Sequence, residues 1–362
     1  MPVIIWWTPF TGLEQNKRKC KSGSCHFTED RSYVSLENGT KLILFYGSDF
    51  KVEDLPLPRK AEHWWGVIHE EAPHNQPLFN HQPVLELFNL TSTFKENSGM
   101  PLTLLYLQNI DTLISSTYFK STKSKNALTE ERTISPILYL QSNCDPPSQR
   151  DKYVEEISKL IPIDSYGSCL NNRELPKHLR SIDSVNHPDI LKLIANYKFT
   201  IAFENYACED YITEKLWRPL GVGSVPIYWG SPSIENWIPN KNSIIHVRDY
   251  ESPQHLAIHL LNVLGNDTLY EQYLEHKLLK NVGNKKLKDA LELREWGIYE
   301  DQQTMDTFVE AFECYVCEMV LKLYNVSKPG TVMADKTHYG CSAPETMLPI
   351  SDHYFWKEGS MA

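Results

Sequence analysis

The amino-acid sequence predicts an α/β protein built from two lobes. Its 362 residues are about twice the soft prior of ~150 residues per domain, which favours two cores. Short apolar runs that end at Pro or Gly, typical of buried parallel strands, alternate with stretches of helical periodicity. Hydrophobic residues at 41%, aromatic residues at 11% and charged residues at 23% are ordinary globular values, so collagen-like, coiled-coil and wholly disordered chains are excluded.

The first third of the chain contains four predicted strands. Val3–Trp7 and Lys41–Gly47 are apolar runs ended by Pro or Gly, and Leu85–Asn89 follows the same pattern. His63–Ile68 also has the composition of a strand. Polar or helix-compatible stretches lie between these runs, so the pattern is α/β rather than a β-sandwich. Lys120–Thr133 is polar and has no apolar periodicity, which predicts the boundary between the lobes there.

From residue 135 the chain alternates strands with helices at the spacing of a Rossmann-like lobe. No G-x-G-x-x-G follows these strands and no P-loop sequence occurs, so the usual fingerprints of nicotinamide and P-loop nucleotide sites are missing. The predicted strands are Ile137–Leu140, Ile163–Gly167, Phe199–Phe203 and Ser224–Gly230, and the predicted helices are Arg150–Leu160, Ile190–Tyr197 and Asp210–Trp217.

Two adjacent carboxylates, Glu70 and Glu71, follow the predicted strand His63–Ile68, at the end where α/β folds place their chemistry. A zinc-protease motif needs a second histidine one helical turn after His69, but Pro73 stands there. If the strand continues, His69 and Glu71 share one face and Glu70 points to the other. A carboxylate at this edge could act as a general base. A solvated acidic turn is the alternative.

The densest cluster of polar and aromatic residues runs from Phe203 to Pro219. Asp210 is a suitable N-cap for a helix, and Pro219 supplies its stop signal. Tyr211 and Lys215 then lie four residues apart on one helical face. An ammonium near a helix N-terminus, at the carboxyl edge of a parallel sheet, suits a diphosphate. An ordinary amphipathic helix with a solvated ion pair is the alternative.

The net charge argues against a nucleic-acid partner, and the cysteine content favours the secretory pathway. Acidic residues outnumber basic ones by 46 to 36, and the longest basic run is Lys17–Lys19. No stretch approaches the ~18 apolar residues that cross a bilayer, and Met1–Trp7 lacks a basic region and a cleavage site, so we expect any signal or membrane anchor to have been removed. Eight cysteines and four Asn-x-Ser/Thr sequons fit a luminal chain, with reduced thiols in a cytosol as the alternative. The sequons stand at Asn38, Asn89, Asn266 and Asn325.

The segment that begins at Phe203 resembles a family signature. Phe203–Asn205, Asp210–Lys215 and Gly223–Pro226 are similar to the motif of the α1,3-fucosyltransferases of glycosyltransferase family 10. Further motifs resemble the fucosyltransferase ten and eleven branch, whose members are described as protein O-fucosyltransferases three and four acting on EMI domains. These motifs are Trp6–Pro9, Phe45–Phe50, Leu55–Arg59, His69–Glu71, Cys144–Pro147 and Phe312–Cys317.

The resemblance implies a GT-B fold of two Rossmann-like lobes, with GDP-β-L-fucose bound in the carboxyl-terminal lobe. It implies an inverting fucosyltransferase of the endoplasmic reticulum or Golgi lumen, a type II membrane protein at full length. The expected acceptor is Ser or Thr of an EMI domain. The alternatives are GlcNAc on an N-glycan or Lewis-type antenna, and a luminal binding module without turnover. The expected divisions are an acceptor-side lobe over 1–134, a donor lobe over 135–305 and a tail over 306–362 that packs on the first lobe.

By the same resemblance, Glu71 takes the place of the general base and Glu70 is its competitor. Arg150 and Lys215 match the cations that hold the diphosphate and stabilise charge on the leaving group. The sequence has no D-x-D motif, so neither a metal nor a cofactor is expected. The other donor-site positions are Glu204, Asn205, Tyr211 and Glu214 for fucose and ribose, and Ser142, Asn143, Tyr166 and Gly167 around the guanosine, where a plain turn is the alternative for the last two.

The cysteines are expected to be structural. Cys314 and Cys317 form a C-x-x-C pair, but no second pair completes four zinc ligands and no thioredoxin-like βαβ unit precedes it. In related fucosyltransferases such a terminal pair is tied to two amino-terminal cysteines, which implies disulfides from Cys20 and Cys25 to Cys314 and Cys317. The pairing of the remaining four stays open: Cys144, Cys169, Cys208 and Cys341.

Overall fold

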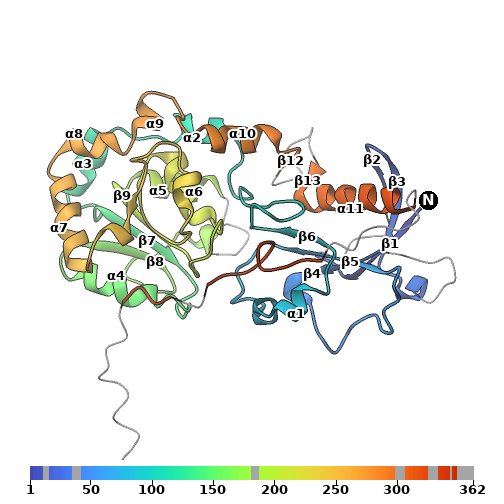
Figure 1. Cartoon of the computed structure of the whole chain (residues 1–362). Helices are drawn as coiled ribbons and strands as arrows, with labels where there is room; N and C mark the ends of the chain where they lie inside the picture. The colour runs from blue at the N-terminus through green and yellow to red at the C-terminus, as the bar shows by residue number, and fades with distance from the viewer. Residues whose placement is uncertain are drawn as a thin grey trace, which may run out of the picture.

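The computed structural model describes residues 1–10, 16–34, 42–180, 187–297, 306–324, 333–342 and 345–348. They form two α/β lobes, each built on a sheet of mostly parallel strands, which confirms the predicted fold class (Figure 1). Helix α10 (Lys285–Leu293) leads from the second lobe toward the first, where the long helix α11 (Phe308–Tyr324) lies over the sheet. Among these described residues, no helix is long and apolar enough to span a bilayer.

The first sheet has the strand order β2-β3-β1-β4-β5-β6. The edge strand β2 runs antiparallel to β3, and all other neighbours are parallel. Trp6 and Phe312 belong to the core between this sheet and α11, and Phe45, Phe79 and Phe88 belong to a second, aromatic core. The strands are β1 (Val3–Thr8), β2 (Asn16–Cys20), β3 (Gly23–Thr28), β4 (Leu42–Tyr46), β5 (Trp64–His69) and β6 (Leu90–Thr93).

The prediction of a strand over Leu85–Asn89 is wrong. A single helical turn, α1 (Gln82–Leu85), comes first, and β6 begins only at Leu90. Leu85 and Phe88 are both buried, so the apolar pattern of this segment comes from a packed turn. Periodicity alone does not separate a short buried turn from a short buried strand.

The sequons have different environments. Asn89 is only 6% exposed, and its Oδ1 accepts hydrogen bonds from the backbone N–H of Trp65 at 3.0 Å and from Arg59 at 2.7 Å. This burial argues against a glycan on Asn89, whose occupancy the sequence left open. Asn266 is exposed, and its side chain accepts from the backbone N–H of Leu269 as an N-cap. The sequons at Asn38 and Asn325 lie outside the described residues.

The second sheet has the strand order β11-β10-β9-β7-β8 with every neighbouring pair parallel. Its strands follow the predicted ones closely. They are β7 (Ile137–Gln141), β8 (Ile163–Gly167), β9 (Phe199–Phe203), β10 (Val225–Trp229) and β11 (Ile245–His246). The helices of this half are α2 (Ile110–Ile114), α3 (Thr122–Glu130), α4 (Arg150–Ser158), α5 (Pro188–Ala195), α6 (Glu214–Val222), α7 (Pro253–Leu264), α8 (Asp267–Gln272) and α9 (Glu275–Leu278). Strands β12 (Trp296–Gly297) and β13 (Asp306–Thr307) form a separate two-stranded sheet.

Each lobe places its first strand inside the sheet, so that chain crossovers leave it in two directions. Strand β1 lies between β3 and β4, and β7 lies between β8 and β9. Loops that follow two such neighbouring strands diverge and open a crevice at the carboxyl edge of the sheet. The fold therefore predicts a binding crevice at the carboxyl ends of β7 and β9 in the second lobe.

The polar segment Lys120–Thr133 is a helix rather than a linker. It forms α3, whose N-cap Ser121 accepts a hydrogen bond from the backbone N–H of Ser124. The buried ammonium of Lys125 donates to the carbonyl oxygen of Gly223, in the second lobe. We infer that the boundary between the lobes precedes this helix. The partner of Lys125 lies far along the chain, which is why local polarity suggested a linker.

All eight cysteines form disulfides. Two bonds fasten α11 to the β2–β3 hairpin, as the resemblance implied. One bond lies within the second lobe and one joins the tail to that lobe, and these assign the four cysteines that the sequence left open. The pairs are Cys20–Cys314, Cys25–Cys317, Cys144–Cys169 and Cys208–Cys341.

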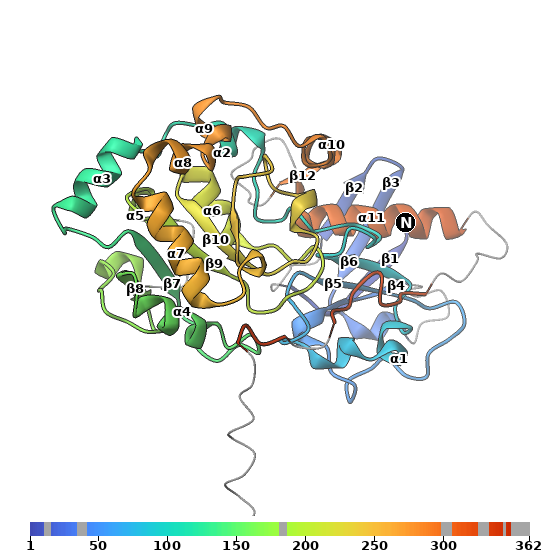
Figure 2. The same ribbon diagram turned by 60° about the vertical axis from the view of Figure 1, so that its left-hand side comes forward.

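The tail beyond α11 contacts both lobes. On the first lobe, the backbone N–H of Ala334 donates to the carbonyl oxygen of Phe88 at 2.8 Å. The tail then crosses to the second lobe, as both views show (Figures 1 and 2). There Glu345 forms an ion pair with Arg248 at 2.7 Å. The expectation that the tail packs on the first lobe is therefore correct for the part of the tail near Ala334 and wrong for the part near Glu345.

Candidate active site

A cavity of about 650 Å³ opens at the crevice between the loops that follow β7 and β9. Ser142 and Asn143 come directly after β7, and Asn205 comes after β9. Gly167 ends β8, and its positive φ of 86° is one that glycine adopts without strain, while a Cβ would collide with the carbonyl oxygen of Gln141. Six residues predicted at the donor site line this one cavity: Ser142, Asn143, Gly167, Asn205, Glu214 and Lys215.

Helix α6 begins later than predicted. Its N-cap is Thr213, whose side chain accepts from the backbone N–H of Lys215, and it ends at Val222 with Gly223 as its C-cap and Pro219 inside the helix. Asp210 is not the cap, because its Oδ1 instead accepts from the indole N–H of Trp237 at 3.0 Å. Asp and Thr are both preferred caps, so the sequence did not distinguish them. Lys215 is consequently in the first turn, while Tyr211 precedes the helix and shares no helical face with it.

Three charged side chains gather at the start of α6. The Nζ of Lys215 lies 3.6 Å from Oε2 of Glu204 and 3.4 Å from Oε1 of Glu214. Burial is the largest influence on the pKa of Lys215 and lowers it, but these two carboxylates outweigh it and raise the pKa above its usual value. Burial likewise favours a higher pKa for Glu214, but Lys215 and Arg218 hold that pKa at about 2. The cavity wall therefore presents an ammonium at neutral pH.

Arg150 is fully buried behind the cavity. Its Nη1 donates to the carbonyl oxygen of Phe203 at 2.8 Å and to Oδ1 of Asn205 at 2.7 Å, and its Nη2 donates to the carbonyl oxygen of Asn143 at 2.8 Å. These bonds hold the loops after β7 and β9 in place. The resemblance implied that Arg150 grips a diphosphate, and that role stays a prediction, since the described contacts of its Nη atoms are with protein acceptors.

Three other predicted donor residues, Tyr166, Glu204 and Tyr211, lie outside the cavity lining. Tyr166 is 8% exposed and its hydroxyl lies 3.1 Å from that of Tyr197, so its described contact is with the core. Glu204 is fully buried and accepts from the backbone N–H of Thr213 at 2.7 Å. Glu204 thereby fixes the N-terminus of α6, which presents Lys215 to the cavity.

The two carboxylates after β5 have different partners. Glu71 is partly exposed, and its Oε2 accepts a hydrogen bond of 3.0 Å from the hydroxyl of Tyr211, which belongs to the second lobe. Glu70 accepts 2.9 Å from the hydroxyl of Tyr46 within its own lobe, and burial raises its pKa to about 7. Strand β5 ends at His69, so the alternation of faces does not extend to Glu71. The hydrogen bond to Tyr211 connects Glu71 with the segment Phe203–Pro219 of the second lobe, which contains several of the predicted donor residues.

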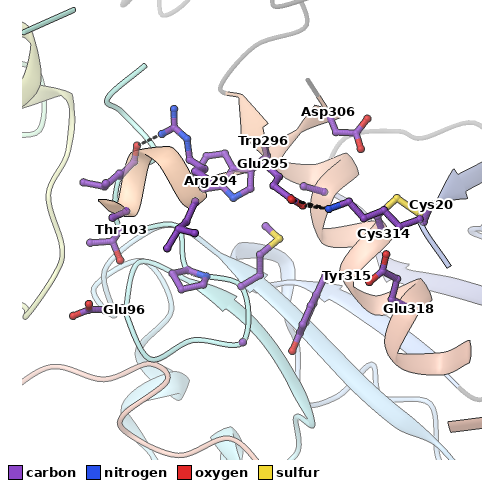
Figure 3. Close-up of a pocket in the computed structure, with 18 of the residues that line it drawn as sticks. Cys20, Glu96, Thr103, Arg294, Glu295, Trp296, Asp306, Cys314, Tyr315 and Glu318 are labelled. Carbon is purple, nitrogen blue, oxygen red and sulfur yellow. Dashed lines mark hydrogen bonds and ion pairs between the residues drawn. A yellow bond between two sulfur atoms is a disulfide. The ribbon is translucent and has the colours of Figure 1, made fainter. Parts of the chain in front are cut away.

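The structure also has a second cavity, of about 710 Å³ (Figure 3). It is bordered by the β2–β3 hairpin, α10, β12 and α11. The ion pair between Lys21 and Glu295 crosses its rim, and Arg294 donates to the carbonyl oxygen of Leu104 at 2.8 Å. None of the predicted catalytic or donor-binding residues lines it, whereas six of the predicted donor residues line the first cavity.

Sequence reasoning missed several residues of the site, among them Arg218 and Tyr339. Arg218 lines the donor cavity, and its position three residues after Lys215 on a helix was a usable signal. The hydroxyl of Tyr339 donates to the backbone carbonyl of Glu71 at 2.9 Å. No pattern in the sequence links these two residues, because they are far apart along the chain.

Comparison with known proteins gives consistent matches over most of the chain. A family model described as glycosyltransferase family 10 (fucosyltransferase) C-term matches residues 130–325, and one described as fucosyltransferase, N-terminal, matches residues 1–104. GDP-fucose protein O-fucosyltransferase 3 of Xenopus laevis is 43% identical over 96% of this chain and 75% of its own length. The Homo sapiens protein of that name is 44% identical over 95% and 71%. A solved α1,3-fucosyltransferase with GDP is 16% identical, covers 84% of this chain and 82% of its own, and has a TM-score of 0.48.

Proposed function

The chain belongs to glycosyltransferase family 10 and is a GDP-fucose-dependent fucosyltransferase, and from that premise we propose that it transfers fucose to Ser or Thr of a folded protein. We propose an EMI domain as the acceptor and inversion as the stereochemical course. The observation that carries the proposal is the 3.0 Å contact between Tyr211 and Glu71. It joins a carboxylate of the first lobe to the donor segment of the second. The names of the relatives support a protein acceptor.

In the proposed reaction Glu71 accepts the proton of the acceptor hydroxyl. The hydroxyl oxygen forms a bond to the anomeric carbon of fucose. The bond from that carbon to the β-phosphate oxygen breaks, and its electron pair stays on that oxygen. A single displacement of this kind converts the β-linked donor to an α-linked product. Deprotonation by a positioned carboxylate typically contributes about 10²–10⁴ in rate. GDP leaves with the additional negative charge.

Charge on the departing diphosphate is balanced by protein cations in this proposal. Lys215 lies at the N-terminus of α6, where backbone N–H groups and the helix dipole also favour anions. We propose that no metal ion is required for this reason. Transfer should persist in EDTA, and a loss on chelation that manganese restores would contradict the proposal.

The disulfides and the exposed sequon at Asn266 support a compartment that permits oxidation and glycosylation. We propose the lumen of the endoplasmic reticulum or Golgi, with a type II membrane anchor in the full-length protein. Microscopy of the full-length tagged protein, with protease protection of its domain in microsomes, tests this. A domain exposed to cytosolic protease contradicts it.

The acceptor is tested by a side-by-side assay. The enzyme is given GDP-fucose with a folded EMI domain in one arm and with an N-glycopeptide bearing terminal GlcNAc in the other. We expect transfer to the folded domain and little to the glycopeptide or to the unfolded domain. Transfer to the glycopeptide alone would overturn the protein acceptor, and GDP-fucose binding without transfer or hydrolysis in any arm would favour a binding module.

A further inference from the structure

Two loops from different lobes run side by side where the lobes meet. One loop follows β6 of the first lobe, and the other follows β9 of the second. The contacts that join them are the Phe94 and Tyr211 rings with centroids 5.2 Å apart, the Lys95–Glu209 ion pair at 3.2 Å, and a hydrogen bond of 3.1 Å from the backbone N–H of Glu96 to Oδ2 of Asp210. These contacts connect the carboxyl edges of the two sheets through the loops that follow their strands.

The carboxylate of Asp210 is the central group of this junction. Asp210 is 8% exposed, and its Oδ1 accepts hydrogen bonds from the hydroxyl of Ser233 at 2.8 Å and from the indole N–H of Trp237 at 3.0 Å. Both of these donors follow β10, whereas the donor to Oδ2 belongs to the first lobe. One buried side chain thus joins the loops after β6, β9 and β10. The neighbouring Glu209 is 64% exposed, so its ion pair contributes little.

The backbone of Asp210 is also held in an uncommon conformation. Its φ is 64°, in the left-handed region that glycine adopts freely and that aspartate tolerates better than most residues. Its N–H is shared between the hydroxyl oxygens of Ser231 at 2.9 Å and Ser233 at 3.0 Å. Such conformations persist where the surroundings hold them, and they cluster at functional sites. The chain is redirected here just before Tyr211, whose hydroxyl donates to Glu71 at 3.0 Å.

We propose that Asp210 is a positioning residue for fucose transfer: its carboxylate fastens the loop after β6 to the loop after β9, and its backbone directs the hydroxyl of Tyr211 to Glu71. The inference rests on the proposed function, in which Glu71 is the base. Asp210 is not among the described residues that line the first cavity, so it acts through Tyr211 rather than on GDP-fucose. Misplacing a reacting group by ~1 Å can lower a rate by ~10².

Three substitutions separate the side chain of Asp210 from its backbone. Asp210→Gly removes the carboxylate and accepts the φ of 64° without strain, whereas Asp210→Ala removes the carboxylate and adds strain. Asp210→Asn tolerates this φ and keeps one acceptor oxygen, but its amide nitrogen cannot accept a hydrogen bond. The matched control is Glu209→Gln, which removes the charge of the adjacent, exposed ion pair between the lobes.

Each variant is measured for transfer from GDP-fucose to the folded protein acceptor, for GDP affinity by isothermal titration and for thermal unfolding. We expect kcat/KM for the acceptor to fall roughly 10- to 100-fold in Asp210→Gly and at least as far in Asp210→Ala. Asp210→Asn should recover most of the loss, and Glu209→Gln should stay within about twofold of the wild type. GDP affinity should stay within about threefold in every variant. Asp210→Ala should melt at a lower temperature than Asp210→Gly because of its backbone strain.

A double-mutant cycle shows whether Asp210 acts through the hydroxyl of Tyr211. Tyr211→Phe removes this hydroxyl and should itself lower kcat/KM for the acceptor. If both residues serve the same contact with Glu71, the double variant Asp210→Gly/Tyr211→Phe should lose no more than about threefold beyond the more impaired single variant. A merely structural role of Asp210 would instead multiply the two losses. If Asp210→Gly does not fold, Asp210→Asn takes its place in the cycle.

Three outcomes would overturn the proposal: normal kcat/KM in folded Asp210→Gly, a loss of GDP affinity as large as the loss of kcat/KM, and multiplied losses in the cycle with Tyr211→Phe. Each is distinct from failure of the proposed function. In that case the wild type does not transfer fucose to the protein acceptor, or Glu71→Gln transfers it at the normal rate. Loss of transfer with retained GDP affinity and a coupled cycle supports the assignment of Asp210.

Discussion

The parallel strands of the two lobes follow one order, but the lobes carry different chemistry at their carboxyl edges. In each lobe, the first parallel strand lies between the second and the third parallel strand of the chain, β1 between β3 and β4 and β7 between β8 and β9. The second lobe places a helix N-terminus with Lys215 and Arg218 at a cavity, while the first places Glu70 and Glu71 beside aromatic side chains. The comparison teaches that the scaffold supplies an edge and that the residues at strand ends decide what the edge does.

The edges also differ in how they are assembled. The proposed donor cavity is lined by residues between 140 and 218, so one stretch of chain builds it. Glu71 is instead held by Tyr211 of the other lobe and by Tyr339 of the tail. The first edge is therefore complete only when the lobes and the tail are docked, and releasing the tail should affect it more than the donor cavity.

The largest expected effect concerns the disulfide that fixes the tail to the second lobe. Cys208 and Cys341 are 133 residues apart and Cys144 and Cys169 are 25 apart. The chain-entropy model gives about 5 kcal/mol for the first bond and about 3.5 kcal/mol for the second. The double variant Cys208→Ser/Cys341→Ser should thus lose more unfolding free energy in denaturant titrations than Cys144→Ser/Cys169→Ser.

The same tail-released variant should lose transfer while keeping GDP affinity, because Tyr339 no longer holds the backbone of Glu71. The Cys144→Ser/Cys169→Ser variant is the matched control for loss of a disulfide. If the tail-released variant transfers fucose at the normal rate, the tail has no part in completing the first edge.

The next effect is on the donor side. Lys215→Ala removes a partly exposed ammonium from the start of α6 and should cost roughly 2–4 kcal/mol of transition-state stabilisation, a fall of about 30- to 1000-fold in kcat/KM. Lys192→Ala, which removes an exposed ammonium on α5 paired with Asp189, is the control. Nearly normal kcat/KM for Lys215→Ala would place the critical cation elsewhere.

Sequence patterns predicted the second lobe well because its elements are specified locally. Strands such as Phe199–Phe203 are uninterrupted apolar runs, and the donor loops follow them directly. The start of α6 was misplaced because Asp210 and Thr213 are both good caps, and the choice depends on Trp237, which binds Asp210 across the lobe. The inward orientation of Arg150 likewise depends on acceptors after β7 and β9.

The first lobe was less predictable because its polar groups find partners far away in sequence. The role of Tyr339 could not be predicted, since it binds Glu71 from the opposite end of the chain. Asn89 matched a glycosylation sequon, yet its side chain is a buried hydrogen-bond acceptor for Trp65. The assignment of Glu71 over Glu70 stays a prediction, and the reason offered from alternating faces does not apply beyond His69.

A smaller effect should distinguish the two carboxylates of the first edge. Burial raises the pKa of Glu70 from its usual value near 4.5 to about 7. The stability that its protonated form contributes is fully present below about pH 4.5 and is lost as pH rises through about 7. Glu70→Gln stays neutral, so its melting temperature relative to the wild type should rise between pH 5 and pH 8. The exposed Glu53→Gln is the control, and a pH-independent difference for Glu70→Gln would contradict burial of an ionisable group.

The smallest effect is a difference between two sequons. Glycopeptide mapping of the protein from a secretory host should find a glycan on Asn266, whose exposed side chain can cap α8 through Oδ1 while Nδ2 carries the sugar. Asn89 should be unmodified, because it is buried against Trp65. An occupied Asn89 would mean that the packing of β5 and β6 differs from the one described.

We propose that the edge of the first lobe supplies the base and the edge of the second binds GDP-fucose. Measuring GDP affinity and fucose transfer in Glu71→Gln and Glu70→Gln tests this most directly. Gln keeps the size of the side chain and accepts the Tyr211 hydrogen bond but takes no proton. The account predicts that Glu71→Gln binds GDP within about twofold of the wild type while transfer falls by about 10² or more, and that Glu70→Gln is far milder. Near-normal transfer by Glu71→Gln, with transfer abolished in Glu70→Gln and GDP binding intact, would contradict it.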